Sequence, residues 1–183
     1  RPQRLERDGL FGVFRRQAEP LDDRGRILAS AQLEIRQHYP QPGWVENDPE
    51  AFWQALCQAC QHLWANTNVP KSAVAGVVIT TQRATTITLD KAGQPLRPAI
   101  VWLDQRRTER TAKLKWWWEA AFKLIGMRET VLHFQKEAEA NWIAHHQPDI
   151  WAKTDKYLFL SGYLNYRFTG RFVDSVASQV GYV

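Results

Sequence analysis

Residues 78–106 read VITTQRATTITLDKAGQPLRPAIVWLDQR, and this stretch decides the fold class. It opens with the end of Val74–Thr80, an apolar run rich in β-branched residues that is typical of a central strand buried on both faces. Thr85–Leu89 predicts a second strand, and Asp90–Gly93 predicts a turn that leads back to a third strand over Pro98–Leu103. We therefore expect a sheet at the centre of the domain.

The sequence before this stretch predicts a β-hairpin. Apolar and polar residues alternate from Ile27 to Ile35, which is typical of a half-buried strand. Asp22–Gly25 is a turn sequence, with glycine where a positive φ is needed. Leu10–Phe14 predicts a weaker first strand, because glycines interrupt its apolar residues.

A long helix is expected after the hairpin. Apolar residues recur at helical spacing over Phe52–Trp64, and either Asn47 or Asp48 is placed to cap the helix. Cys57 and Cys60 lie three residues apart within it, so both belong to one helix face. A zinc site needs four ligands, and the sequence contains no second cysteine pair. We interpret the two cysteines as part of a buried face, with a redox or metal role as the alternative.

From Thr108 onward the sequence is mostly helical, and no internal repeat is present. Mixed strands and helices favour an α/β or α+β layered domain. The expected helices are Lys113–Ile125 ended by Gly126, Glu137–His145 before Pro148, a short turn at Asp149–Lys153, and Gly162–Phe168 capped by Ser161 and ended by Gly170.

The composition is that of a globular domain, with 44% hydrophobic and 23% charged residues in a chain of 183. The net charge of +5 arises largely from arginines scattered through the first sixteen residues. They lack interleaved aromatic residues, so we expect a solvated segment and no nucleic-acid partner. No apolar run reaches the about 18–20 residues that span a bilayer, and no signal peptide is visible. We therefore expect no membrane association and a cytoplasmic location.

Three stretches, taken with their order and spacing, resemble the N-terminal domain of the FGGY carbohydrate kinases, the family that includes glycerol kinase, xylulokinase and ribulokinase. They are Asp22–Asp48, a hairpin turn and outgoing strand that lead into PGWVENDP (Pro42–Pro49), residues 78–106, and Trp151–Gly170, which ends in YLNYRFTG. The resemblance begins at Asp22. It therefore divides the chain into an atypical N-terminal segment, residues 1–21, and a partial kinase domain, residues 22–183.

The resemblance implies an incomplete α/β domain of the ribonuclease H-like (actin-like ATPase) type, a mixed sheet with flanking helices. A complete relative uses ATP and Mg²⁺ to phosphorylate a hydroxyl of a sugar or polyol. Residues 1–21 do not match the family's glycine-rich phosphate-binding hairpin, and its catalytic aspartate and nucleotide domain lie beyond Val183. We therefore expect no catalytic residue, metal ligand or tightly bound ATP in this chain, and no activity in isolation.

The resemblance implies that Gln82, Arg83 and Trp102 bind the substrate. The guanidinium of Arg83 can donate to two hydroxyl oxygens at once, and Gln82 can orient its neighbours. Trp102 offers an apolar face to the carbon side of a polyol. The alternatives are an arginine paired with a carboxylate at a strand end and a tryptophan in the core. We expect the strand leading into Gln82 and the strand ending at Trp102 to lie side by side.

Two further candidates are Asp104 and Phe134. Asp104 either binds a substrate hydroxyl or pairs with Arg106 or Arg107 in a structural network. Phe134 falls near a family tyrosine that touches substrate, and plain packing is its alternative. Where glycerol kinase has a second substrate-binding residue, a glutamate, this chain has Ala84, so we do not expect glycerol as the substrate.

The sequence leaves two other readings open. One is a non-catalytic sugar-binding or regulatory module, and the other is one chain of a split kinase. The expected partners are a small sugar or polyol and either a missing C-terminal half or a second copy of the chain. The sequence does not indicate which sugar is bound.

Overall fold

The computed structural model describes residues 13–109 and 114–175. The chain forms two compact units. The first contains the described residues up to His38 together with Asn47–Thr80, and the second contains Tyr39–Glu46 together with the described residues from Thr81 onward. Within the described residues, no helix has both the length and the apolar character needed to cross a bilayer.

The first unit contains the predicted hairpin. β1 (Val13–Ala18) pairs antiparallel with β2 (Ala31–Arg36), with Val13 opposite Arg36 and Ala18 opposite Ala31. The first strand thus runs beyond the predicted Leu10–Phe14, whose first three residues lie outside the described ones. The second strand starts four residues later than expected, because Ile27 instead forms an isolated bridge with Leu21 across the turn. Gly25 in this turn has the expected positive φ, 75°.

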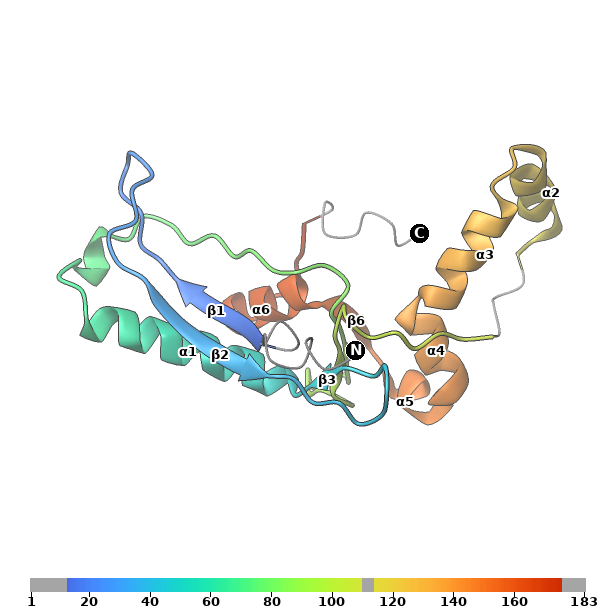
Figure 1. Cartoon of the computed structure of the whole chain (residues 1–183), viewed down its shortest axis with the longest axis horizontal. Coiled ribbons are helices and arrows are strands. Elements are labelled where there is room, and N and C mark those ends of the chain that lie inside the picture. Colours follow the sequence, from blue (N-terminus) through green and yellow to red (C-terminus); the bar gives the residue numbers. More distant parts are fainter. Residues whose placement is uncertain (1–12, 110–113, 176–183) are drawn as a thin grey trace, which may run out of the picture. The chain divides into compact units, whose positions relative to one another are not determined.

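The predicted long helix is α1 (Pro49–Ala65), which packs against both strands of the hairpin (Figure 1). Asp48 is its cap, since its carboxylate accepts a hydrogen bond from the backbone N–H of Glu50 at 2.9 Å. Cys57 and Cys60 are free and half-buried on this helix. Burial raises the pKa of the Cys60 thiol, so neutral pH leaves it protonated.

The prediction of a strand over Val74–Thr80 is wrong. After the short 3₁₀ turn η1 (Lys71–Ala73), this segment is extended but belongs to neither described sheet, and Val77 and Val78 are 71% and 88% exposed. A strand buried on both faces needs neighbouring strands and a covering layer on each side. The described residues supply neither, so the apolar pattern alone does not produce a strand here.

The second unit is built on β5 (Ala99–Ile100), β4 (Thr86–Leu89) and β6 (Lys156–Phe159), in that spatial order. β4 lies antiparallel to both neighbours, with Thr86 opposite Ile100 and Phe159. β3 (Glu46–Asn47) lies next to β5 and forms the edge of the sheet on that side. The predicted Pro98–Leu103 strand is therefore only two residues long. The predicted turn is present, with Gly93 at φ +76°.

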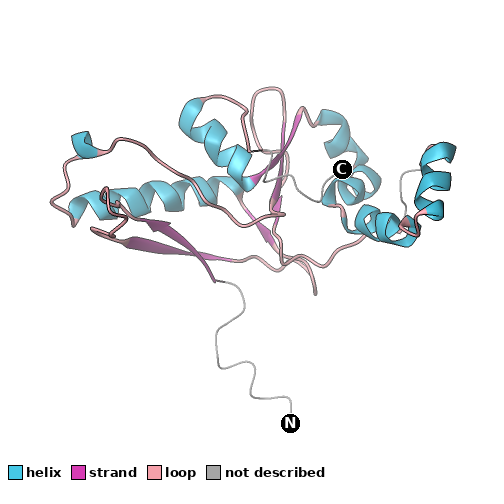
Figure 2. Ribbon diagram, turned by 90° about the horizontal axis from the view of Figure 1, so that it is seen from above, coloured by secondary structure: helices cyan, strands magenta, loops and turns pink. Residues whose placement is uncertain are grey.

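Helices cover this sheet and extend beyond it (Figure 2). They are α2 (Trp116–Leu124), α3 (Arg128–Glu137), α4 (Glu139–His146), α5 (Pro148–Lys153) and α6 (Leu160–Thr169). A core cluster joins Ile100 of β5 to Trp142 and Ile143 of α4. A second buried group comes from α6, whose Leu160, Tyr163 and Leu164 are almost fully buried.

Two helix predictions are corrected here. The sequence did not predict α3, which ends at Glu137, where one helix over Glu137–His145 was expected to begin. Ser161 does not cap α6, because the cap position is Phe159 and the Ser161 hydroxyl donates to Asp174 at 2.7 Å. Gly170 ends α6 in the left-handed conformation as expected, with φ +69°.

Candidate functional site

The β4–β5 pair brings three of the predicted site residues to one end of the sheet. Antiparallel pairing sets Thr86, at the start of β4, opposite Ile100, at the end of β5. Arg83 and Gln82 come just before Thr86 in the chain, and Trp102 comes just after Ile100. The two chain segments that carry them therefore meet at this sheet end.

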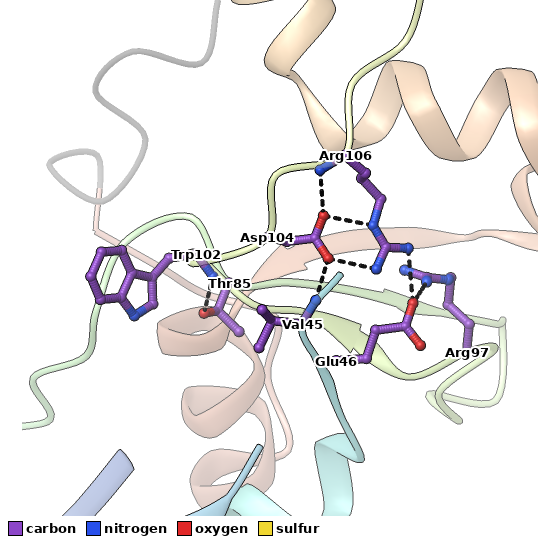
Figure 3. Close-up of polar contacts among 7 residues, drawn as sticks. All are labelled: Val45, Glu46, Thr85, Arg97, Trp102, Asp104 and Arg106. Atoms are coloured by element: carbon purple, nitrogen blue, oxygen red, sulfur yellow. Dashed lines mark hydrogen bonds and ion pairs between the residues drawn. The ribbon is translucent and has the colours of Figure 1, made fainter. Parts of the chain in front are cut away.

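A single buried hydroxyl links these two segments. Thr85 is fully buried, and its Oγ1 accepts a hydrogen bond from the Gln82 side-chain amide at 3.0 Å. The same oxygen accepts one from the backbone N–H of Trp102 at 3.4 Å (Figure 3). The Thr85 carbonyl accepts from the N–H of Leu160 at 2.9 Å, which attaches the junction to the start of α6.

Arg83 and Trp102 are both exposed to solvent. Arg83 is exposed, and within the described part of the chain no carboxylate forms an ion pair with it. Trp102 is 50% exposed, so its ring is not a core side chain. Ala84 between Arg83 and Thr85 has φ +57°, a strained conformation for a residue other than glycine. The structure thus leaves both side chains exposed, in the two chain segments that meet at this sheet end.

Asp104 pairs with Arg106, which was the structural alternative to binding a substrate hydroxyl. Its side chain is 2% exposed, and its Oδ1 accepts from the backbone N–H of Arg106 at 2.8 Å and from Arg106 Nε at 2.7 Å. Its Oδ2 accepts from Arg106 Nη2 at 2.6 Å and from the N–H of Val45 at 2.7 Å (Figure 3). Both carboxylate oxygens are therefore already used within the protein.

The network around Asp104 continues to a second carboxylate. Arg106 Nη1 donates to Glu46 Oε1 at 2.8 Å, and Arg97 donates to the same oxygen. The Arg106 guanidinium lies 4.0 Å from the ring centroid of Trp44 and 4.7 Å from that of Trp142. The network joins the segment before β3 to the segment after β5, which also carries Trp102.

Burial gives this network its electrostatic character. It lowers the pKa of Arg97, and the nearby Glu46 charge opposes that shift. The sequence did not single out Glu46 or Arg97. The available signal was weak: Glu46 follows the apolar pair Trp44 and Val45, and Arg97 lies just before the apolar residues from Ala99.

Phe134 stands apart from these groups. It is 55% exposed on α3, and its ring contacts His133 at a centroid distance of 6.1 Å. The end of α3 is bound to the segment after Asp104, because the N–H of Thr108 donates to the Lys136 carbonyl at 3.0 Å. None of the contacts described for Phe134 reaches Gln82, Arg83 or Trp102, so its role in a substrate pocket stays a prediction.

The described residues also contain an open hollow of about 630 Å³ between α2 and α3. No predicted site residue lines it, and its walls mix both charges with apolar surface, so we assign it no chemistry. Its lining residues are Trp116, Glu119, Ala120, Lys123, Gly126, Arg128 and Glu129. Among the residues that the structure describes, no group of three or more histidine, cysteine, aspartate or glutamate side chains is arranged to hold a metal ion.

Comparison with known sequences assigns most of the chain to one family. Residues 15–182 match the N-terminal domain of the FGGY family of carbohydrate kinases. A glycerol kinase of Thermococcus onnurineus is 33% identical over 156 residues, which cover 83% of this chain and 31% of that protein. A glycerol kinase of Acidovorax sp. is 45% identical over 95 residues, covering 51% of this chain and 19% of that protein. The chain thus spans at most about a third of the length of these relatives.

Solved structures give the fold. A xylulose kinase from Rhodospirillum rubrum superposes with a TM-score of 0.72 at 22% identity, covering 94% of this chain and 37% of that one. A Plasmodium falciparum glycerol kinase with ADP superposes with a TM-score of 0.59 at 22% identity, covering 87% and 34%. These neighbours confirm the predicted mixed α/β fold of the ribonuclease H-like (actin-like ATPase) type.

Proposed function

Since this chain belongs to the FGGY family of carbohydrate kinases, we propose that it supplies the carbohydrate-holding part of an ATP-dependent kinase that phosphorylates a sugar or polyol hydroxyl. The observation that carries this proposal is the meeting of Gln82, Arg83 and Trp102 at one end of the β4–β5 pair. The substrate, the ATP requirement and the cytoplasmic location of the full-length kinase are all part of the proposal.

The side chains at this sheet end suit a small polyhydroxylated ligand. The exposed Arg83 fork can donate to two adjacent hydroxyl oxygens. The half-exposed Trp102 ring can cover the C–H face of the same molecule. Gln82 is held by Thr85 through its amide nitrogen, which fixes the direction of its carbonyl oxygen as an acceptor for a hydroxyl. Together they orient a hydroxyl group for transfer without themselves taking its proton.

Phosphoryl transfer is proposed to need the rest of the full-length kinase. ATP with Mg²⁺ supplies the phosphoryl group and neutralises its charge when bound. Asp104, the one carboxylate among the candidate site residues, is not free to act as the base, since Arg106 and Val45 hold it. We therefore propose that the isolated chain binds substrate without turning it over, and that its partner is the remaining part of the kinase.

The proposed substrate class excludes a strong preference for glycerol. The relatives at 33% and 45% identity are glycerol kinases, which favours a polyol. Ala84, however, has only a methyl group and accepts no hydrogen bond from a hydroxyl. We propose a longer polyol or ketose, whose additional hydroxyls compensate for that missing contact.

Isothermal titration calorimetry with glycerol, xylitol, ribitol, D-xylulose and D-ribulose tests this proposal. We expect saturable binding of a five-carbon ligand that Arg83→Ala abolishes. Lys91→Ala is the matched control, because it removes an exposed cation in the turn at the opposite end of β4. No heat from any of the five ligands, or equal loss in both variants, would reject the proposed site.

A coupled assay for ADP release tests the second half of the proposal. The isolated chain with ATP, Mg²⁺ and the best ligand should give no turnover above the protein-free rate. Measurable phosphoryl transfer would show that the chain contains its own base and nucleotide site, contrary to the proposal.

A further inference from the structure

Three threonines in and beside β4 are buried equally but bonded differently. Thr85, Thr86 and Thr88 are at most 2% exposed. Among the described residues, the Oγ1 atoms of Thr86 and Thr88 have no hydrogen-bond partner, whereas that of Thr85 accepts from two donors. The Thr85 hydroxyl is therefore the one that links other groups.

The two donors come from different segments of the site. The Gln82 amide belongs to the turn before β4, and the Trp102 N–H belongs to the segment after β5, 17 residues from Thr85 in sequence. The oxygen between them is shielded from water, so water does not readily replace it as their common acceptor. The threonine itself is restrained, because its side chain is β-branched and its carbonyl accepts a hydrogen bond from the N–H of Leu160.

We propose that Thr85 is a positioning residue for substrate binding, whose hydroxyl fixes the Gln82 side chain and the Trp102 backbone relative to each other. This inference rests on the proposed function for the importance of Gln82 and Trp102. It predicts that carbohydrate affinity depends on an oxygen that never touches the carbohydrate.

Thr85→Val is the direct test, because valine keeps the branched shape and removes the acceptor. The two donors then lose a buried partner, which is expected to weaken carbohydrate binding about tenfold. Thr85→Ser restores the hydroxyl and should restore affinity to near the wild-type value. Thr88→Val is the matched control, since it removes a buried hydroxyl without a described partner and should leave the Kd unchanged.

Amide hydrogen exchange gives a readout without any ligand. In the folded wild type the Trp102 N–H should exchange slowly, and Thr85→Val should speed its exchange at least fivefold while Thr88→Val leaves it unchanged. If Thr85→Val does not fold, Thr85→Ser serves instead, and slow exchange at Trp102 is expected there. Fast Trp102 exchange in the folded wild type or in Thr85→Ser would overturn the inference.

The two proposals fail in different ways. If the wild type binds none of the five-carbon ligands, the proposed function is rejected, and the exchange experiment still decides whether Thr85 holds Trp102. If the wild type binds and Thr85→Val changes the Kd no more than Thr88→Val does, the positioning role is rejected while the binding site stands.

Discussion

Replacing Arg106 by alanine removes the group on which the buried network converges. The Arg106 side chain is 2% exposed and donates to both oxygens of Asp104 and to Glu46. Its guanidinium also lies against the rings of Trp44 and Trp142. Arg106→Ala therefore leaves two carboxylates and two aromatic faces without their shared partner.

The expected loss of stability follows from what remains. Removing one partner of a buried ion pair costs about 3–5 kcal/mol. Asp104 keeps its hydrogen bond from the Val45 N–H, and Glu46 keeps Arg97, so we expect the lower end, about 3 kcal/mol. For a domain of this size that corresponds to a fall in Tm of roughly 6–12 °C. A loss of about 3 kcal/mol is a large share of the roughly 5–15 kcal/mol by which folded domains are stable.

Urea unfolding, followed by tryptophan fluorescence and circular dichroism, measures this cost. Arg107→Ala is the adjacent control, because Arg107 is 61% exposed in its pair with Glu137. Exposed pairs contribute about 0–1 kcal/mol, and added salt weakens them further. If Arg106→Ala costs no more than Arg107→Ala, the reasoning from burial is refuted. The double variant Asp104→Asn with Arg106→Met should recover part of the loss, since no unpaired buried charge remains.

Three further outcomes are expected. Gly93→Ala should destabilise the fold by about 2–4 kcal/mol in thermal unfolding, because φ is +76° and a Cβ would clash first with the Tyr166 hydroxyl and then with Cζ at 2.9 Å. Tyr166→Phe removes the hydroxyl, so adding it should restore part of that loss, and full additivity would exclude the clash. Backbone hydrogen bonding from Arg26 lowers the pKa of Asp22, so the hairpin should be fully stabilised above the usual carboxyl range and weaken as the pH falls through the lowered pKa. An NMR titration that places the pKa of Asp22 at or above the ordinary aspartate value of 3.8 would contradict this. Ala84→Glu should strengthen glycerol binding at least tenfold in calorimetry by adding a hydroxyl acceptor, and an unchanged Kd would reject the assigned role of this position.

Local signals predicted much of what lies around β4. Thr85–Leu89 with the Asp90–Gly93 turn predicted a strand and its return, and the β4–β5 pair confirms both. The strand expected to lead into Gln82 and lie beside the one ending at Trp102 is absent, and β4 takes its place as the neighbour of β5. Asp48 was one of two predicted caps, and Gly170 was the predicted helix end. Each of these features depends on neighbours within a few residues, which sequence patterns report well.

Longer-range features were not predictable in the same way. Arg97 and Arg106 lie 51 and 60 residues from Glu46, so no local period indicates that they share one carboxylate. The failed strand over Val74–Thr80 has the same origin, because its strand character requires partners that the run does not itself contain. Phe134 could not be placed because no sequence pattern predicted α3, the helix that carries it.

The exposed run from Val74 to Thr80 has a practical consequence for anyone handling this protein. It is uncharged and rich in valine and isoleucine, and within the described structure its backbone has no strand to pair with. Segments of this composition are recruited into cross-β fibrils when two molecules meet. Since such encounters become more frequent as concentration rises, concentrated solutions should slowly form fibrils that bind thioflavin. Dilute solutions should form them more slowly.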